Sequence, residues 1–178
     1  MIDVQQGALD GCIDASEVIE RINDLSARAT EAGTAVIFIQ HAGADDGLHY
    51  GSQRWQLAEG VVRPDGSFLV EKTYRDAFAD TELERLLARL AVERLVLTGL
   101  HSDYCVQMTA LSALLRGYDI VLVSDGHTTF DSPEHPSLSG EAITALVNAR
   151  MGMLRHPERE VEVLPAAEVV FGDRQEMR

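Results

Sequence analysis

Runs of hydrophobic, often β-branched residues alternate along the chain with segments in which hydrophobic residues recur every three or four positions. The continuous runs predict parallel strands that are covered on both faces, because a half-exposed strand would alternate with polar residues. These predicted strands span residues 35–39, 68–70, 94–99, 119–125 and 161–164. The opening residues, MIDVQQG, resemble the end of one further strand.

The segments with helical periodicity lie between these strands. They predict one helix between Asp14 and Gly33 and others over residues 81–90, 103–116 and 143–151. Asp14 and Glu17 resemble a capping box at the start of the first helix. This alternation predicts right-handed crossovers and an α/β fold, with a doubly wound parallel sheet and helices on both faces. We expect a single domain over residues 1–178.

Two long segments without periodicity, residues 41–60 and 126–140, both follow predicted strands. In open parallel sheets, the loops after the carboxyl ends of the strands build the ligand crevice. Asp3, Lys72 and Cys105 each follow a different predicted strand. The topology therefore predicts that these three reactive groups converge on one crevice.

The formal net charge of −14 argues against a nucleic-acid partner, because such proteins neutralise phosphates with basic patches. No hydrophobic run has the length of a membrane span, and the N-terminus does not resemble a secretory signal. The chain has two cysteines, too few to suggest a disulfide framework. We expect a cytoplasmic protein that acts on a small molecule and binds neither nucleic acid nor membranes.

Three blocks resemble the isochorismatase-like cysteine hydrolases, which include nicotinamidases, N-carbamoylsarcosine amidases, ureide hydrolases and streptothricin hydrolase. The blocks are MIDVQQG, EKTYRDAF and TGLHSDYCVQMTA, and their order and spacing extend over almost the whole chain. The resemblance implies a three-layer, Rossmann-like sheet with the strand order 3-2-1-4-5-6. It also implies a homo-oligomer, such as a dimer or tetramer. Family members have a fuller first strand, so we expect either an upstream start or a short central strand.

The resemblance also implies roles for the three groups. Asp3 is expected to be the general base, Lys72 its charged partner and Cys105 the nucleophile. A cis peptide bond is expected between Leu100 and His101, so that the backbone amides of His101 and Cys105 form an oxyanion hole. A helix N-terminus and a nearby lysine should lower the pKa of the thiol. The thiolate would add to a carbonyl carbon to give an acyl-thioenzyme that water then hydrolyses.

Zinc-binding relatives carry an Asp-x-His element after the second strand, where this chain has His41 and Gly43. We therefore expect neither a metal ion nor another cofactor. True isochorismatases lack the cysteine and hydrolyse a vinyl ether. Cys105 therefore favours the hydrolysis of a C–N bond in a small amide, ureide or lactam. The alternatives are vinyl-ether hydrolysis and a non-catalytic binding or assembly role, in which the thiol would be unreactive.

Four further side chains are candidates for substrate binding: Gln40, Trp55, Tyr104 and Phe130. Trp55 lies in the first long polar segment, and the others lie just past the ends of predicted strands. An amide substrate needs apolar walls and a few polar groups to orient it. The same residues would also serve as ordinary packing residues, and the sequence leaves both roles open.

Overall fold

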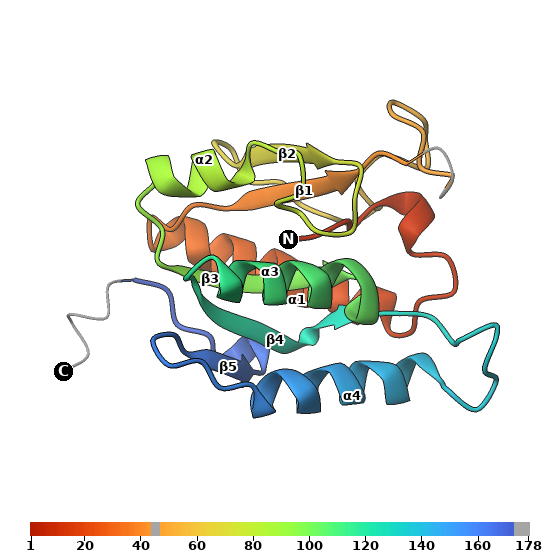
Figure 1. The fold of residues 1–178 in the computed structure, drawn as a ribbon. Helices are drawn as coiled ribbons and strands as arrows, with labels where there is room; N and C mark the ends of the chain where they lie inside the picture. The colour runs from red at the N-terminus through yellow and green to blue at the C-terminus, as the bar shows by residue number, and fades with distance from the viewer. Residues whose placement is uncertain (44–46, 173–178) are drawn as a thin grey trace.

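A computed structural model describes residues 1–43 and 47–172 of the chain (Figure 1). In these residues, β1 (Ile37–His41) pairs with β2 (Phe68–Lys72). A second group contains β3 (Arg94–Leu100), β4 (Asp119–Thr128) and β5 (Val161–Leu164), with β4 in the middle. Every pairing between these strands is parallel, as the continuous hydrophobic runs predict.

The N-terminal segment lies between the two groups of strands. Ile2 forms single parallel bridges to Ile39 of β1 and to Gly99 of β3. Four backbone hydrogen bonds of 2.8–2.9 Å flank these bridges, and Met1, Ile2 and Asp3 take part in them. The segment is therefore held like a strand over about one residue, but it is not a strand. The opening residues therefore pair as the expected short strand only at Ile2, between β1 and β3, and the full strand order stays a prediction.

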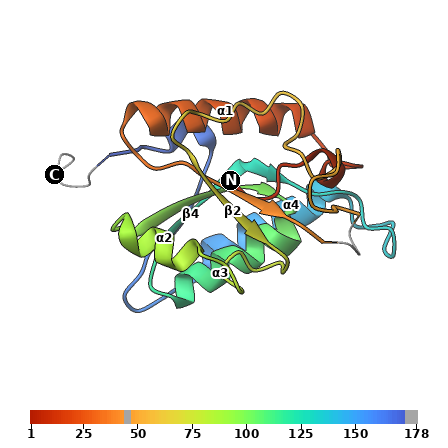
Figure 2. The ribbon, with the colours of Figure 1, turned by 90° about the horizontal axis from the view of Figure 1, so that it is seen from above.

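Helices cover both faces of the sheet, which gives the three layers that the sequence predicts. Figure 2 shows α1 (Ala15–Glu31) on one face. On the other face lie α2 (Leu83–Arg89), α3 (Gln107–Leu115) and α4 (Gly140–Met153). Short 3-10 turns, η1 (Gln6–Ala8) and η3 (Ala166–Glu168), follow the N-terminal segment and β5. A π-helical turn, η2 (Ser102–Val106), joins β3 to α3.

Local details differ from the sequence predictions. The predicted capping box at α1 is wrong, because Asp14 has a left-handed backbone with φ 46° and its side chain does not cap the helix. The carboxylate of Glu17 instead accepts a hydrogen bond from Ser16 at 2.9 Å. Strand β1 is shifted two residues toward the C-terminus, and β4 continues to Thr128. Both shifts place polar residues of the predicted loops on strand ends.

Three clusters of buried hydrophobic residues hold the layers together. The largest packs the inner sides of α2, α3 and α4 against the sheet around Leu87, Ala110 and Val147. A second joins α1 to the N-terminal segment, and a third joins α1 to β4 and η3. No helix in residues 1–43 and 47–172 is long and apolar enough to cross a membrane.

A cavity of about 530 Å³ opens beside Met1, at the amino-terminal ends of β1 and β3. Residues of α1 and α2 line it together with residues of the two strands. Asp3, Lys72 and Cys105 do not line this cavity. It is therefore separate from the crevice in which the sequence places the reactive groups.

Candidate active site

Asp3, Lys72 and Cys105 meet at the carboxyl-terminal edge of the sheet. The Nζ atom of Lys72 lies 2.6 Å from Oδ2 of Asp3 and 3.3 Å from Sγ of Cys105. Lys72 is the last residue of β2, Asp3 directly follows the Ile2 bridges, and Cys105 lies in the turn after β3. All three residues are buried. The convergence predicted from the ends of the strands is confirmed.

The path of the chain around Gly99 allows Asp3 to approach Cys105. Gly99 has φ 121°, and a Cβ atom at this position would collide with the backbone of Ile2. Only glycine combines this conformation with so close an approach. The predicted cis peptide bond between Leu100 and His101 is confirmed. In the turn that follows, the amide of Val106 donates to the carbonyl of His101.

The electrostatics of Cys105 oppose the sequence prediction. Burial raises the pKa of the thiol to about 12, and the negative charge of Asp3 adds to this effect. The positive charge of Lys72 acts in the opposite direction but is outweighed. The expected lowering of the thiol pKa is therefore wrong. Around neutral pH the resting side chain is a neutral thiol, and a base must remove its proton during the reaction.

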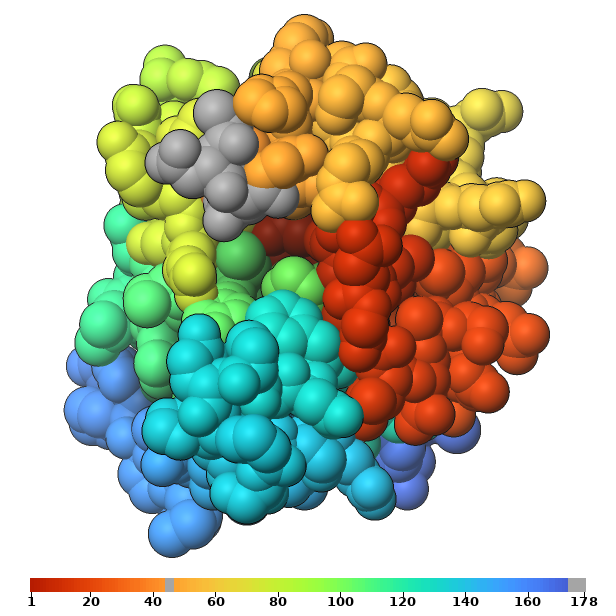
Figure 3. All heavy atoms as spheres, turned by 90° about the vertical axis from the view of Figure 1, so that its right-hand side faces the viewer, coloured from red at the N-terminus to blue at the C-terminus, as the bar shows by residue number. Residues whose placement is uncertain are grey.

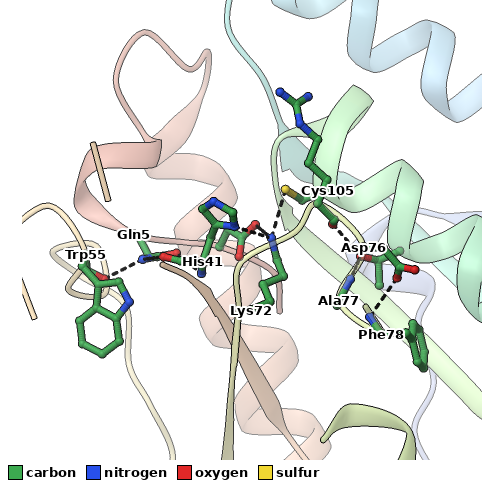
Figure 4. A network of polar contacts seen from close by, with 11 residues as sticks. Gln5, His41, Trp55, Lys72, Asp76, Ala77, Phe78 and Cys105 are labelled. Carbon is green, nitrogen blue, oxygen red and sulfur yellow. Dashed lines mark hydrogen bonds and ion pairs between the residues drawn. The ribbon is translucent and has the colours of Figure 1, made fainter. Parts of the chain in front are cut away.

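Lys72 has a third contact that the sequence did not indicate. Its Nζ atom lies 3.3 Å from Nδ1 of His41, the last residue of β1 and the register partner of Lys72 (Figure 4). An ammonium group carries three N–H donors and no acceptor. Asp3, Cys105 and His41 thus surround this buried ammonium group with one contact each. The nitrogen of His41 that faces Lys72 acts as the acceptor.

A second group of hydrogen bonds holds the backbone of His41 through the side chain of Gln5. Oε1 of Gln5 accepts from the amide of His41 at 2.8 Å, and Nε2 of Gln5 donates to the carbonyl of His41 at 2.9 Å. Nε2 of Gln5 also donates to the carbonyl of Trp55 at 2.8 Å, and Nε2 of Gln40 donates to the same oxygen at 2.9 Å. These contacts fasten the loop around Trp55 to the ends of the strands.

Gln40 and Trp55 therefore have structural contacts beside their predicted role. In Figure 4, Gln5 and His41 lie between Trp55 and Cys105. The indole Nε1 of Trp55 is buried and makes no hydrogen bond within residues 1–43 and 47–172. That Gln40 and Trp55 bind substrate stays a prediction.

Aromatic side chains gather beside η2, the turn of Ser102–Val106 that carries Cys105 and is called the nucleophile turn below. The ring of His101 lies 5.0 Å from that of Phe130 and 6.2 Å from that of Tyr104, and the Tyr104 and Phe130 rings are also 6.2 Å apart. The guanidinium carbon of Arg75 stacks 3.9 Å from the centre of the Tyr104 ring. The structure thus brings two predicted substrate-binding residues, Tyr104 and Phe130, into one aromatic group with a cation at its edge.

His101 takes part in this group as a neutral ring. Its Nε2 atom lies 2.7 Å from the carbonyl oxygen of Ala8, which only accepts, so Nε2 carries the proton. Burial lowers the pKa of His101, and this effect outweighs the hydrogen bond to Ala8. The side chain of His101 is therefore used to fix the turn, while its backbone amide is the predicted oxyanion donor.

The face that carries these residues is hollowed at its centre. Figure 3 shows the hollow between the N-terminal segment in red, the loop of residues 126–140 in cyan and the yellow-green chain after β2. Atoms in the green of residues near 100 lie at its floor. The hollow leads from solvent toward the end of β3, where the nucleophile turn begins.

No group of three histidine, cysteine, aspartate or glutamate side chains in the part of the chain that the structure describes is arranged to hold a metal ion. His41 occupies the place at which zinc-binding relatives carry an aspartate, and its Nδ1 atom faces a lysine instead. This donor set does not fit the zinc site of those relatives. The reactive groups that remain are a thiol, a carboxylate and an ammonium group.

Two residues of the site, Gln5 and Arg75, escaped the sequence analysis, which noted His41 only as a departure from the zinc-binding element. Gln5 and His41 follow strand ends just as Asp3 and Lys72 do, so the same argument from strand ends could have found them. Arg75 lies three residues after Lys72 and carries no sequence signal for its contact with Tyr104.

Comparisons with known proteins place the chain in a family. The isochorismatase domain model matches residues 1–147. Two proteins from Streptomyces noursei named streptothricin hydrolase are each 35% identical to the chain over 176 residues. The matches cover 96% of this chain and 68% and 62% of the two relatives. This chain therefore corresponds to about two thirds of their length.

The fold has close counterparts among solved structures. The crystal structure of a cysteine hydrolase from Pseudomonas syringae pv. phaseolicola 1448A superimposes with a TM-score of 0.83. The superposition covers 94% of this chain and 87% of that protein, at 17% sequence identity. At this identity the likeness concerns the fold, and it agrees with the layers described above.

Proposed function

The chain belongs to the isochorismatase family of hydrolases, and on that premise we propose that it cleaves the C–N bond of a small amide, ureide or lactam through an acyl-thioenzyme. The observation that carries the proposal is the contact of one buried ammonium group with both a carboxylate and a thiol. Lys72 lies 2.6 Å from Asp3 and 3.3 Å from Cys105. This set supplies a base, a nucleophile and a fixed positive charge within one crevice.

Asp3 removes the proton from Cys105 as the sulfur attacks the carbonyl carbon. Because burial keeps the pKa of the thiol near 12, the proton is transferred during attack and not before it. Lys72 holds the carboxylate of Asp3 in place through their ion pair. Its charge also favours the sulfur anion that develops as the proton leaves.

The tetrahedral intermediate places a negative charge on the former carbonyl oxygen. The backbone amides of His101 and Cys105 are the proposed donors to this oxygen, and each donor of this kind typically contributes about 3–4 kcal/mol. Collapse of the intermediate breaks the C–N bond, and the leaving nitrogen takes the proton held by Asp3. Sulfur and the acyl group then remain joined as a thioester.

Water completes the reaction. Asp3 is again unprotonated after the nitrogen has left, so it can accept a proton from the water that attacks the thioester. The C–S bond breaks, the acid is released and the proton returns to the thiolate of Cys105. Each group is thus restored to its resting protonation state.

The aromatic group around Tyr104 and Phe130 supports a role in holding the substrate beside the sulfur. Streptothricin is the first compound to test, because two relatives of 35% identity carry the name streptothricin hydrolase. We propose a homo-oligomer and a small-molecule substrate as the natural context of the reaction.

The test is a hydrolysis assay with product detection by mass spectrometry, using streptothricin and a panel of small amides, ureides and lactams. We expect Cys105→Ala to lose activity by about a thousandfold or more, as removal of a catalytic nucleophile typically does. Cys12→Ala is the matched control, since Cys12 is the second free cysteine and has no contact with Lys72 or Asp3 among those described.

Three other outcomes would overturn the proposal. Full activity of Cys105→Ala would exclude the thioester mechanism. Turnover of a vinyl ether, with no amide, ureide or lactam cleaved, would assign the isochorismatase reaction in its place. A protein that hydrolyses neither the panel nor a vinyl ether would support a non-catalytic binding role.

A further inference from the structure

A chain of buried side chains lies directly behind the nucleophile turn. Oγ of Ser102 lies 2.7 Å from Nδ1 of His127, and Nε2 of His127 lies 2.9 Å from Oδ1 of Asn148. Nδ2 of Asn148 donates to the carbonyl of Ser124 at 2.8 Å. Ser102 also lies 3.1 Å from Oγ1 of Thr144. These contacts connect η2 to β4 and to α4.

The direction of every hydrogen bond in this series of side chains follows from its last member, the carbonyl group of Ser124. The carbonyl of Ser124 only accepts, so the atom of Asn148 that faces it is the nitrogen, and Oδ1 of Asn148 must accept from His127. Nε2 of His127 therefore carries the proton. A neutral ring then accepts at Nδ1 from the hydroxyl of Ser102, and the oxygen of Ser102 accepts from Thr144.

The hydrogen-bonded series of Ser102, His127 and Asn148 resembles a serine–histidine–asparagine catalytic set, but the burial of these side chains excludes that role. Ser102 has 0% and His127 has 2% of its surface exposed, so no substrate reaches the hydroxyl. Burial also lowers the pKa of His127, which is consistent with the neutral ring deduced from the hydrogen bonds. A fully satisfied buried network of this kind fixes the elements that it joins.

The element that it fixes carries the nucleophile. Ser102 is the first residue of η2, and Cys105 lies three residues later in the same turn. The backbone of the turn is closed by bonds from the amides of Val106 and Gln107 to the carbonyls of His101 and Ser102. The side chain of Ser102 is thus a lateral anchor, which attaches this turn to the sheet and to α4.

We propose that Ser102 and His127 are positioning residues, which hold Cys105 in register with Asp3 and Lys72. This inference rests on the proposed function for its effect on turnover. The sulfur must remain within hydrogen-bond reach of its base, and a displacement of about 1 Å can cost a hundredfold in rate. Loss of the anchor should therefore reduce kcat while substrate binding is retained.

Two substitutions of His127 test its hydrogen bonds to Ser102 and to Asn148 separately. In His127→Asn, the amide oxygen stands where Nδ1 was and can still accept from Ser102, while the bond to Asn148 is lost. In His127→Gln, the amide nitrogen stands near the place of Nε2 and can still donate to Asn148, while the bond to Ser102 is lost. Both variants remove one buried hydrogen bond, so they are matched in their cost to stability.

The experiment compares both variants and Ser102→Ala with the wild type, after circular dichroism has verified that each protein is folded. We expect His127→Gln and Ser102→Ala to lower kcat by about tenfold or more with KM changed less than about threefold. His127→Asn should retain most of the wild-type kcat. Equal losses in the two histidine variants, or unchanged kcat in all three, would overturn the proposal.

A second measurement does not need a substrate. Amide hydrogen exchange at Val106 and Gln107 reports the opening of the turn, because these amides donate to His101 and Ser102. Exchange should accelerate about tenfold in His127→Gln and Ser102→Ala but not in His127→Asn. Unchanged exchange would refute the anchor even in an active enzyme, whereas faster exchange in a chain without hydrolytic activity would refute only the proposed function.

Discussion

At Cys105, two charges of opposite sign act on one buried thiol. Asp3 raises the pKa of the thiol and Lys72 lowers it, while burial is the largest effect and raises it to about 12. A nucleophile of this kind is protected from adventitious reactions, because only a small fraction is thiolate near neutral pH. Its reactivity depends on the base beside it, so the roles of base and nucleophile can be separated by experiment.

Substitution Asp3→Asn should have opposite effects on alkylation and on catalysis. Removing the carboxylate lowers the pKa of the Cys105 thiol, because the negative charge of Asp3 raises that pKa. Alkylation by iodoacetamide at pH 8.5 should therefore become faster. Hydrolysis should fall by about a hundredfold or more, because the general base is absent.

The measurement is the pH dependence of Cys105 alkylation, followed by peptide mass spectrometry so that Cys12 is counted separately. Asp24→Asn is the control, because Asp24 lies on the exposed side of α1 and pairs with Arg28. Slower alkylation in Asp3→Asn would show that Asp3 does not act on the thiol as described here.

At the scale of elements, three helices end in the same way. In α1, α2 and α3, the amides of the second and third residues after the last helical residue donate back to carbonyls of the final turn. In this Schellman motif the first of the two residues is left-handed, and glycine is favoured there. Gly33 after α1 has φ 69° and Gly117 after α3 has φ 88°, but α2 is followed by Ala91 with φ 52°.

Ala91→Gly should therefore stabilise the protein by about 1 kcal/mol, since it relieves the cost of a left-handed alanine. Ala88→Gly is the matched control, because Ala88 is an exposed residue inside α2, where glycine should cost about 1 kcal/mol. Urea denaturation of both variants measures the two effects. Destabilisation of similar size in both would contradict the interpretation of Ala91.

The elements also show how far the sequence determines this site. Hydrophobic runs and glycine positions were sufficient for the parallel strands, the helices and the convergence of Asp3, Lys72 and Cys105. The ends of strands were less predictable, because Gln40 and His41 are polar residues that sit in β1 through their pairing with β2. The capping box at Asp14 failed because the chain enters α1 in a left-handed conformation that directs the side chain elsewhere.

The sign of the thiol pKa shift lay beyond sequence reasoning for another reason. A helix start and a lysine are visible in the sequence, but the burial that outweighs them depends on how the complete fold packs around Cys105. The buried chain from Ser102 to Asn148 was likewise hidden, because its members lie on η2, β4 and α4 and share no local pattern.

At the scale of the whole molecule, the two groups of strands are joined through the N-terminal segment. The α-amino group of Met1 donates to the carbonyl of Ile37 at 3.0 Å, beside the cavity between β1 and β3. Burial lowers the pKa of this amine from 8.0 to about 6. The homo-oligomer expected from the sequence stays a prediction at this scale.

In a chain produced with Met1 as its first residue, the free amine should make the stability of the fold depend on pH. Between pH 6 and pH 8 the unfolded chain binds more protons at this group than the folded chain does. The free energy of unfolding should therefore rise with pH across this interval and level off above it. Urea denaturation at several pH values measures the effect.

Acetylation of the amine provides the control, because a blocked amine cannot titrate while the cavity beside it has room for an acetyl group. The lowered pKa values of His101 and His127 contribute a slope of the same sign at lower pH, so the difference between the free and acetylated chains is the relevant quantity. Identical pH profiles for the two forms would contradict the burial of a titrating amine.

The central claim is that Cys105 carries the acyl group during hydrolysis. Its most direct test is intact-protein mass spectrometry of the enzyme quenched with acid during turnover of the first substrate identified, followed by peptide mapping. The mechanism predicts an acyl adduct on Cys105 that disappears once substrate is consumed and that is absent from Cys105→Ala. Undiminished turnover by Cys105→Ala, or an adduct mapped only to another residue, would contradict it.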